Sequence, residues 1–135
     1  MSQENVDVVR RAIAAFNRGE VDALAATYDW YHADLEFLED PSLPEAAAQR
    51  GPAALEAYFR NFLDLFDDYR FEIEEIVDAG DQVVVVNRQR GRPKGRRAEV
   101  DMRNTWVFEF RDGMISRITP YWDRSKALAA VGLAE

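Results

Sequence analysis

The chain has 135 residues, 47% of them hydrophobic, which is enough for one domain with a buried core and too few for a second domain. Its 17 basic and 25 acidic residues give a net charge of −8, which argues against nucleic acid or an anionic membrane as a partner and favours a neutral or cationic ligand. Because there is no cysteine and only one histidine, disulfides, thiolate metal sites and multi-histidine metal centres are excluded, and we expect no metal and no cofactor.

No targeting or membrane signal stands out. The first residues, MSQENVDVV, lack the basic and then apolar pattern of a leader peptide. No apolar run approaches the roughly 18 residues that a membrane span needs. We therefore expect a cytoplasmic protein.

Helical periodicity in the first half of the chain predicts three helices. The first ends at the Asn17-Arg18-Gly19 segment. A second is expected at about residues 21–28, and a third begins at Pro52, which at the first helical position gives up an N–H group that would have no partner. The apolar stripes are Val6, Val9, Ile13 and Phe16 in the first helix and Leu55, Phe59, Phe62, Leu63 and Phe66 in the third.

Strand patterns dominate from Tyr69 onward. Turn signals at residues 79–81, 91–95 and 112–113 divide this half into an antiparallel meander. A short strand is also predicted upstream, at residues 34–38.

The connection after that upstream strand and the end of the chain complete the pattern. Residues 41–49 are expected to be a loop, because two prolines and small residues offer nothing periodic. A last helix is predicted from Arg124 to Val131, with Asp123 as its N-cap and Gly132 as its end. Helices first and strands afterwards predict an α+β fold, in which helices cover one face of a curved antiparallel sheet.

Alternation along the strands identifies the side chains that face the helices. In residues 101–110 the even positions are mostly aromatic, and in residues 83–90 the odd set is favoured because burying two arginines costs more than burying two amides. The predicted inward residues are Met102, Asn104, Trp106, Phe108, Phe110, Val83, Val85, Asn87, Gln89, Ile118, Pro120 and Trp122.

Three of these inward residues, Asn87, Gln89 and Asn104, carry amides on an otherwise apolar face. A buried amide without a partner is costly, so something must satisfy these groups. A ligand, water or the other amides are the alternatives.

The order of elements resembles the nuclear transport factor 2-like superfamily, and within it the SnoaL-like and ketosteroid-isomerase-like branches. The resemblance rests on a helix pair, a strand ending in Glu39-Asp40-Pro41, a helix behind Gly51-Pro52 and a meander with a Phe-x-Phe-x-x-Gly turn at residues 108–113. It implies a single bacterial SnoaL-like domain over residues 1–135, with a cone-shaped curved antiparallel sheet wrapped by N-terminal helices, a cystatin-like α+β barrel, around a deep apolar pocket.

The resemblance also implies a homodimer joined through the outer face of the sheet. That face would present a surface of mixed charge that is compatible with self-pairing. Its expected residues are Arg88, Arg90, Asp101, Arg103 and Thr105.

Carrying over the active residues of relatives gives a mixed result. Asp40 matches the aspartate before proline that moves the substrate proton in ketosteroid isomerases, but their oxyanion-binding tyrosine and acid correspond to Ala12 and Trp106. The resemblance therefore implies a base without the oxyanion hole, which argues against steroid isomerisation.

Other branches of the superfamily fit no better. The acid–arginine–acid set of limonene-epoxide hydrolases falls on Asn87, Gln89 and Pro120. Scytalone dehydratases use paired histidines, whereas this chain has only His32. The proton-shuttling acid of SnoaL-like cyclases also corresponds to Pro120, with Asp123 nearby.

Two carboxylates, Glu39 and Asp40, compete for the role of general base. Either could instead simply end a strand before Pro41, and a shift of one residue exchanges which acid points inward. His32 is expected at the end of the second helix, where an imidazole often only contacts carbonyl groups, and is the remaining polar candidate.

Three hypotheses follow. The first is a cofactor-free isomerase, lyase, cyclase or hydrolase acting on a small apolar polyketide- or terpenoid-like molecule, with Asp40 or Glu39 as base. The second is a non-catalytic ligand-binding homodimer, and the third is a structural dimer with a filled core. The predicted substrate-binding residues are His32, Tyr28, Phe37, Tyr58, Asn87, Gln89, Asn104, Trp106, Phe108, Ile118 and Trp122.

Overall fold

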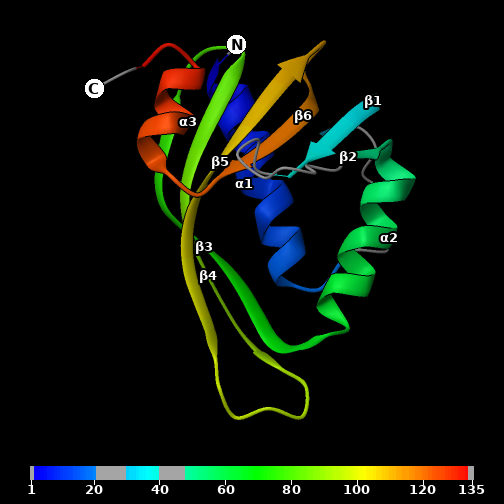
Figure 1. The fold of residues 1–135 in the computed structure, drawn as a ribbon. Helices are drawn as coiled ribbons and strands as arrows, with labels where there is room; N and C mark the ends of the chain where they lie inside the picture. The colour runs from blue at the N-terminus through cyan, green and yellow to red at the C-terminus, as the bar shows by residue number, and fades with distance from the viewer. Residues whose placement is uncertain (1, 21–29, 40–47, 134–135) are drawn as a thin grey trace.

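The computed structural model describes residues 2–20, 30–39 and 48–133, which form three helices and six strands (Figure 1). The predicted helix at 21–28, with Tyr28, lies outside the described residues, and so does Asp40. The helices are α1 (Ser2–Asn17), α2 (Pro52–Leu63) and α3 (Arg124–Ala130). The strands are β1 (Tyr31–Leu38), β2 (Ala48–Arg50), β3 (Phe66–Asp78), β4 (Gln82–Pro93), β5 (Val100–Arg111) and β6 (Met114–Tyr121).

The strands form one curved sheet in the order β2-β1-β6-β5-β4-β3. All neighbouring pairs are antiparallel except β1 and β6, which run parallel. Figure 1 shows α1 and α2 on one side of the sheet and α3 on the other, and the sheet remains open because β2 and β3 are its edges. The predicted α+β class with a curved, mostly antiparallel sheet is confirmed.

α1 packs on the inner face of the sheet through the predicted apolar stripe. Val6, Val9 and Ile13 are buried in the main core, and Phe16 packs against it. The helix is followed by Gly19 at a φ of 72°, a left-handed conformation that glycine adopts without steric cost. The 3.6-residue period of the sequence is therefore the direct cause of this packing.

The predicted inward face of β4 is confirmed. Val83, Val85 and Asn87 are 0% exposed, and Gln89 is also buried. On β5, Asn104 and Phe108 are buried on the same face, where Trp106 packs against the main core.

The opposite face of the sheet is also covered in part. α3 buries Ala127 and Leu128 against Val84 and Val107, which forms a second, smaller core. Thr105 is only 1% exposed. Thr105, which was expected on this outer face, is therefore covered and contributes almost nothing to its surface.

α3 itself matches the prediction to within one residue. Its N-cap is Asp123, whose Oδ1 accepts a hydrogen bond from the Ser125 backbone N–H at 2.9 Å. None of the helices in the described part of the chain has the length and apolar character that a membrane span requires.

Several predicted boundaries are wrong, because strand pairing overrides local pattern. Residues 48–50 form β2 and pair with β1, although residues 48 and 49 were expected in a loop. Phe66 begins β3 opposite Pro93 and is not part of the third helix. β1 begins at Tyr31, so His32 lies in a strand and not at a helix end.

Candidate functional site

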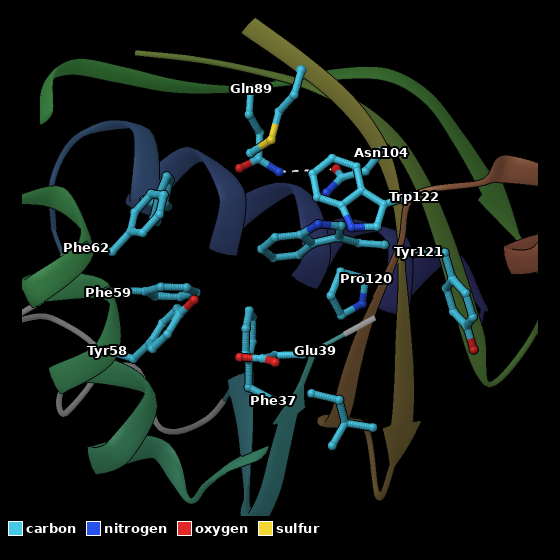
Figure 2. A pocket seen from close by; sticks show the side chains of 14 residues that line it. Phe37, Glu39, Tyr58, Phe59, Phe62, Gln89, Asn104, Pro120, Tyr121 and Trp122 are labelled. Atoms are coloured by element: carbon cyan, nitrogen blue, oxygen red, sulfur yellow. Dashed lines mark hydrogen bonds between the residues drawn. The ribbon is translucent and has the colours of Figure 1, made fainter. Parts of the chain in front are cut away.

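An apolar pocket lies between α2 and the inner face of the sheet (Figure 2). Its volume is about 190 Å³. A cavity of roughly 150 Å³ is large enough to bind benzene, so this pocket has room for a small organic molecule. The lining residues are Phe16, Phe37, Leu38, Glu39, Tyr58, Phe59, Phe62, Gln89, Met102, Asn104, Trp106, Pro120, Tyr121 and Trp122.

Glu39 brings a carboxylate to this pocket. β1 turns Phe37 toward the core, and Glu39 continues the alternation just past the end of the strand. Figure 2 shows the Glu39 side chain turned toward Tyr58 on α2. Burial, and after it the Glu39 carboxylate, raise the pKa of the Tyr58 hydroxyl above its ordinary value of 10.0, so the phenol remains neutral beside the acid.

Glu36 occupies the other face of β1 and is paired there. Its carboxylate lies 2.8 Å from Arg50 Nη1 and 2.9 Å from Arg117 Nη2. The hydrogen bond from Arg117 is the main cause that lowers the pKa of Glu36. Glu36 and Glu39 are thus separated by the alternation of the chain, with Glu36 in an ion-pair cluster and Glu39 at the pocket.

The three buried amides bond to one another. Gln89 Nε2 donates to Asn87 Oδ1 at 3.0 Å and to Asn104 Oδ1 at 3.2 Å, and the Tyr69 hydroxyl donates to Gln89 Oε1. Asn87 Nδ2 donates to the Val85 carbonyl at 3.3 Å. Of the three alternatives left open by the sequence, the amides themselves supply most of the partners.

The donor-to-acceptor direction of these hydrogen bonds determines which polar groups the pocket presents to a ligand. Because the Asn104 carbonyl accepts from Gln89, its Nδ2 remains as the donor, and no residue in the described part of the chain accepts a hydrogen bond from it. Figure 2 shows the Gln89–Asn104 bond at the pocket wall. Asn104 therefore presents N–H groups, and the Gln89 amide is already occupied.

Aromatic rings make up most of the wall. Trp106 meets Phe37 and Phe71 nearly edge to face, with ring centroids 5.4 and 4.9 Å apart. Its indole Nε1 is buried and has no hydrogen-bond partner among the described residues. Trp106 also lines a second, smaller cavity of about 30 Å³ deeper in the core.

The remaining predicted site residues lie elsewhere. Phe108 and Ile118 line the small second cavity, and Asn87 takes part in the amide network without lining the pocket. His32 lies away from the pocket on β1, where its ring nitrogens are 3.1 and 3.3 Å from Arg111 Nη2. Asp34 is 3.9 Å from the same imidazole, which therefore belongs to a surface charge cluster.

Sequence reasoning did not assign several lining residues to a site. Phe59 and Phe62 were predicted on the apolar stripe of a helix, and Met102 and Pro120 on inward strand faces. The periodicity that places a residue inside does not distinguish a solid core from a pocket wall. Phe16, Leu38 and Tyr121 complete the set that was not assigned.

The described residues contain no group of three or more His, Cys, Asp or Glu side chains that could hold a metal ion. The pocket itself combines one carboxylate with aromatic, aliphatic and amide side chains. Such a lining suits an organic molecule with few polar groups.

Comparison with known protein families identifies the family of this chain. The family profile described as SnoaL-like domain matches residues 9–118. No curated protein matches the chain.

Solved structures share the fold at low sequence identity. A nuclear transport factor 2-like protein from Burkholderia xenovorans LB400 is 29% identical, with 97% of each chain covered and a TM-score of 0.73. A protein with a ketosteroid isomerase-like fold from Catenulispora acidiphila DSM 44928, solved in complex with trimethylamine, is 20% identical, with 93% of this chain and 92% of that chain covered and a TM-score of 0.73. A protein from Jannaschia sp. CCS1, provisionally assigned as a SnoaL-like polyketide cyclase, is 19% identical, with 98% and 94% covered and a TM-score of 0.72.

Proposed function

The chain belongs to the SnoaL-like family, and we propose that it binds a small, mainly apolar organic molecule in the pocket and acts on it without a cofactor, with Glu39 as general base. The observation that carries the proposal is the placement of an acid and an amide donor, Glu39 and Asn104, on one aromatic pocket. A base and a donor at one site are what proton abstraction beside a carbonyl requires.

The proposed chemistry divides the work between these two residues. Asn104 Nδ2 would donate to a carbonyl or hydroxyl oxygen of the substrate, and the Glu39 carboxylate would accept a proton from the neighbouring carbon or from water. As the proton leaves, negative charge builds up on the substrate oxygen, where the amide N–H stabilises it. Isomerisation, elimination, ring closure and hydrolysis all share this first step.

The pocket volume limits the substrate. A volume of about 190 Å³ exceeds that of a benzene-binding cavity by a modest margin, so a compound of one or two small rings is the proposed size. The polyketide-like class is suggested by the name of the Jannaschia neighbour, and the terpenoid-like class by the apolar walls.

A second function, binding without catalysis, has one observation in its favour. At the positions where ketosteroid isomerases hold the developing enolate, this chain has Ala12 and Trp106, and both line the deeper cavity. Asn104 would then be the donor left to stabilise charge. A solid structural core, the third hypothesis, is disfavoured by the open pocket.

The test is turnover of small hydroxyketones and epoxides by Glu39→Gln, Asp40→Asn and Asn104→Leu proteins. We expect Glu39→Gln to lower kcat by about 10²–10⁴-fold, since that is the usual contribution of a general base. Asp40→Asn is the matched control, because it removes the carboxylate next to Glu39 in the sequence and leaves Glu39 itself in place.

The outcomes separate the alternatives. Loss of turnover in Asp40→Asn alone would move the role of base to Asp40. If Glu39→Gln and Asp40→Asn both leave turnover unchanged, neither acid is the base. Tight ligand binding without turnover of any screened compound by the unsubstituted protein would favour the non-catalytic function.

A further inference from the structure

The charge of the pocket is one-sided. Its lining contains the Glu39 carboxyl group, and in the described part of the chain no Lys, Arg or His side chain lines it. The other polar side chains of the lining are two amides, two phenols and two indoles, from Gln89, Asn104, Tyr58, Tyr121, Trp106 and Trp122. Since the whole chain also has a net charge of −8, an anionic ligand would be repelled both on approach and in place.

We propose that the ligand of this pocket carries an alkylated ammonium group, seated at the pocket mouth between Glu39 and Tyr58, with its apolar body directed toward Trp106. The proposal rests on the proposed function in one respect, that Glu39 faces a bound ligand. It adds the chemical class of that ligand, an aromatic or alicyclic amine cation.

The pocket mouth combines the carboxylate with ring surfaces. The Tyr58 ring lies 5.3 Å from Phe37 and 6.3 Å from Phe62, measured between centroids, and Figure 2 shows the Glu39 side chain turned toward Tyr58. A cation within about 6 Å of a ring face is attracted by the ring quadrupole. A carboxylate with several rings therefore forms a cation site.

The exposure of the residues at the pocket mouth suits a ligand whose charged group lies at the mouth and whose apolar part lies deeper. Tyr58 is 38% and Trp122 is 57% exposed, whereas Phe37 and Phe59 deeper in the wall are buried. A cation at the mouth keeps part of its hydration while rings contact its other side. The body of the ligand then fills the buried part of the pocket, where its apolar surface is removed from water.

The amide network decides which kind of ammonium group fits. A primary ammonium has three N–H donors that each need an acceptor. The Gln89 oxygen accepts from Tyr69 and the Asn104 oxygen accepts from Gln89, so each of these amide oxygens keeps only one lone pair for a ligand. An alkylated ammonium has few or no N–H groups and presents apolar methyl groups to the rings. Its transfer from water into the pocket therefore costs less free energy of desolvation.

The experiment compares two probes of nearly equal shape that differ in charge. These are meta-hydroxyphenyltrimethylammonium and its neutral counterpart meta-tert-butylphenol, titrated by calorimetry at neutral pH and low salt. We expect the cation to bind about tenfold more tightly or better, because the two probes share apolar contacts and differ in the ammonium charge.

Variants assign the preference to the site. Glu39→Gln should remove most of the preference for the cation and leave the affinity for meta-tert-butylphenol unchanged. Tyr58→Leu should weaken the cation several-fold, and Tyr58→Phe, which keeps the ring, should not. Glu56→Gln on the same helix is the control for a change of net charge, because Glu56 pairs with Arg60 at 2.8 Å and does not line the pocket.

Two results would overturn the proposal. Equal or tighter binding of the neutral probe would show that the pocket does not select a cation. A cation preference that survives Glu39→Gln and Tyr58→Leu would place the cation elsewhere on the acidic surface. High salt should weaken the preference without abolishing it, since the ring contacts are not screened.

The outcome is independent of the test of catalysis. If Glu39→Gln abolishes turnover but the probes bind equally, the proposed function stands and the ligand class is wrong. If the cation preference depends on Glu39 while turnover does not, Glu39 is a counter-ion and the ligand class stands without the base. The two failures are therefore distinguishable.

Discussion

Gly91 allows an aromatic side chain to pack directly on β4. A Cβ atom at this position would collide with Cδ2 of the Tyr69 ring and lie 3.2 Å from Cδ1 of Phe66. The Tyr69 hydroxyl is the donor that orients the Gln89 amide. A residue without a side chain thus sets the direction of the hydrogen bonds that end at Asn104.

Gly91→Ala should destabilise the protein by about 1–3 kcal/mol, the usual cost of forcing atoms into a packed site. Urea unfolding measures this loss. In a double-mutant cycle with Tyr69→Ala the two losses should not add, because removing the ring removes the clash. Additive losses would show that Gly91 acts independently of Tyr69, and Arg92→Ala, an exposed neighbour on β4, serves as the control.

Specific side chains connect the helices to the sheet, and the clearest case is the hydrogen-bonded contact between α1 and β3. Asn17, the last residue of α1, donates from Nδ2 to the Phe71 carbonyl and accepts at Oδ1 from the Phe71 N–H, both at 2.8 Å. β3 is an edge strand, so these backbone groups have no strand beside them to pair with among the described residues. The side chain of a helix end therefore replaces a strand at this edge.

Asn17→Ala should lower the free energy of unfolding by about 1–3 kcal/mol, because two groups of the buried residue Phe71 lose their partner. Hydrogen exchange of the Phe71 amide should accelerate more than that of its neighbours. Asn17→Asp keeps the acceptor for the Phe71 N–H and loses the donor, so an intermediate loss is expected. Unchanged protection in Asn17→Ala would contradict this role.

Across the described part of the molecule, several surface charges form pairs. Arg88 and Asp101 pair on β4 and β5, and Arg103 lies 2.9 Å from Glu74 on β3. The hydrogen bond from Arg88 lowers the pKa of Asp101, as that from Arg117 lowers the pKa of Glu36. Isolated surface pairs contribute little, but several that titrate together make stability depend on pH.

Stability should fall as the solution is acidified. The folded-state pKa values of Glu36 and Asp101 lie below their ordinary values of 4.5 and 3.8, so their contribution is complete above those values. It is lost as pH falls through the lower folded values. Urea unfolding between about pH 6 and pH 3 measures this loss.

The control for the pH dependence is Arg117→Gln, which removes the hydrogen bond to Glu36. Its stability should fall less steeply below the ordinary pKa of 4.5, because the pKa of Glu36 returns toward that value. An identical slope in the two proteins would show that this pair does not contribute.

The elements whose pattern is local could be predicted from the sequence. The helix stripe of Val6, Val9 and Ile13, the inward set of β4 and the cap at Asp123 follow from periodicity and from the chemistry of a few neighbouring residues. The SnoaL-like fold class followed from the order of such elements.

What remained depends on contacts between segments far apart in the chain. The sequence alone determined which residues face inward, because helix and strand periods are properties of consecutive residues. Only the tertiary structure decided that residues 48–50 become a strand beside β1, that α3 packs against Val84 and Val107, and that the inner face leaves a pocket with Glu39 at its wall. The physical reason is that pairing and packing are satisfied between elements, and no local pattern records the distance between them.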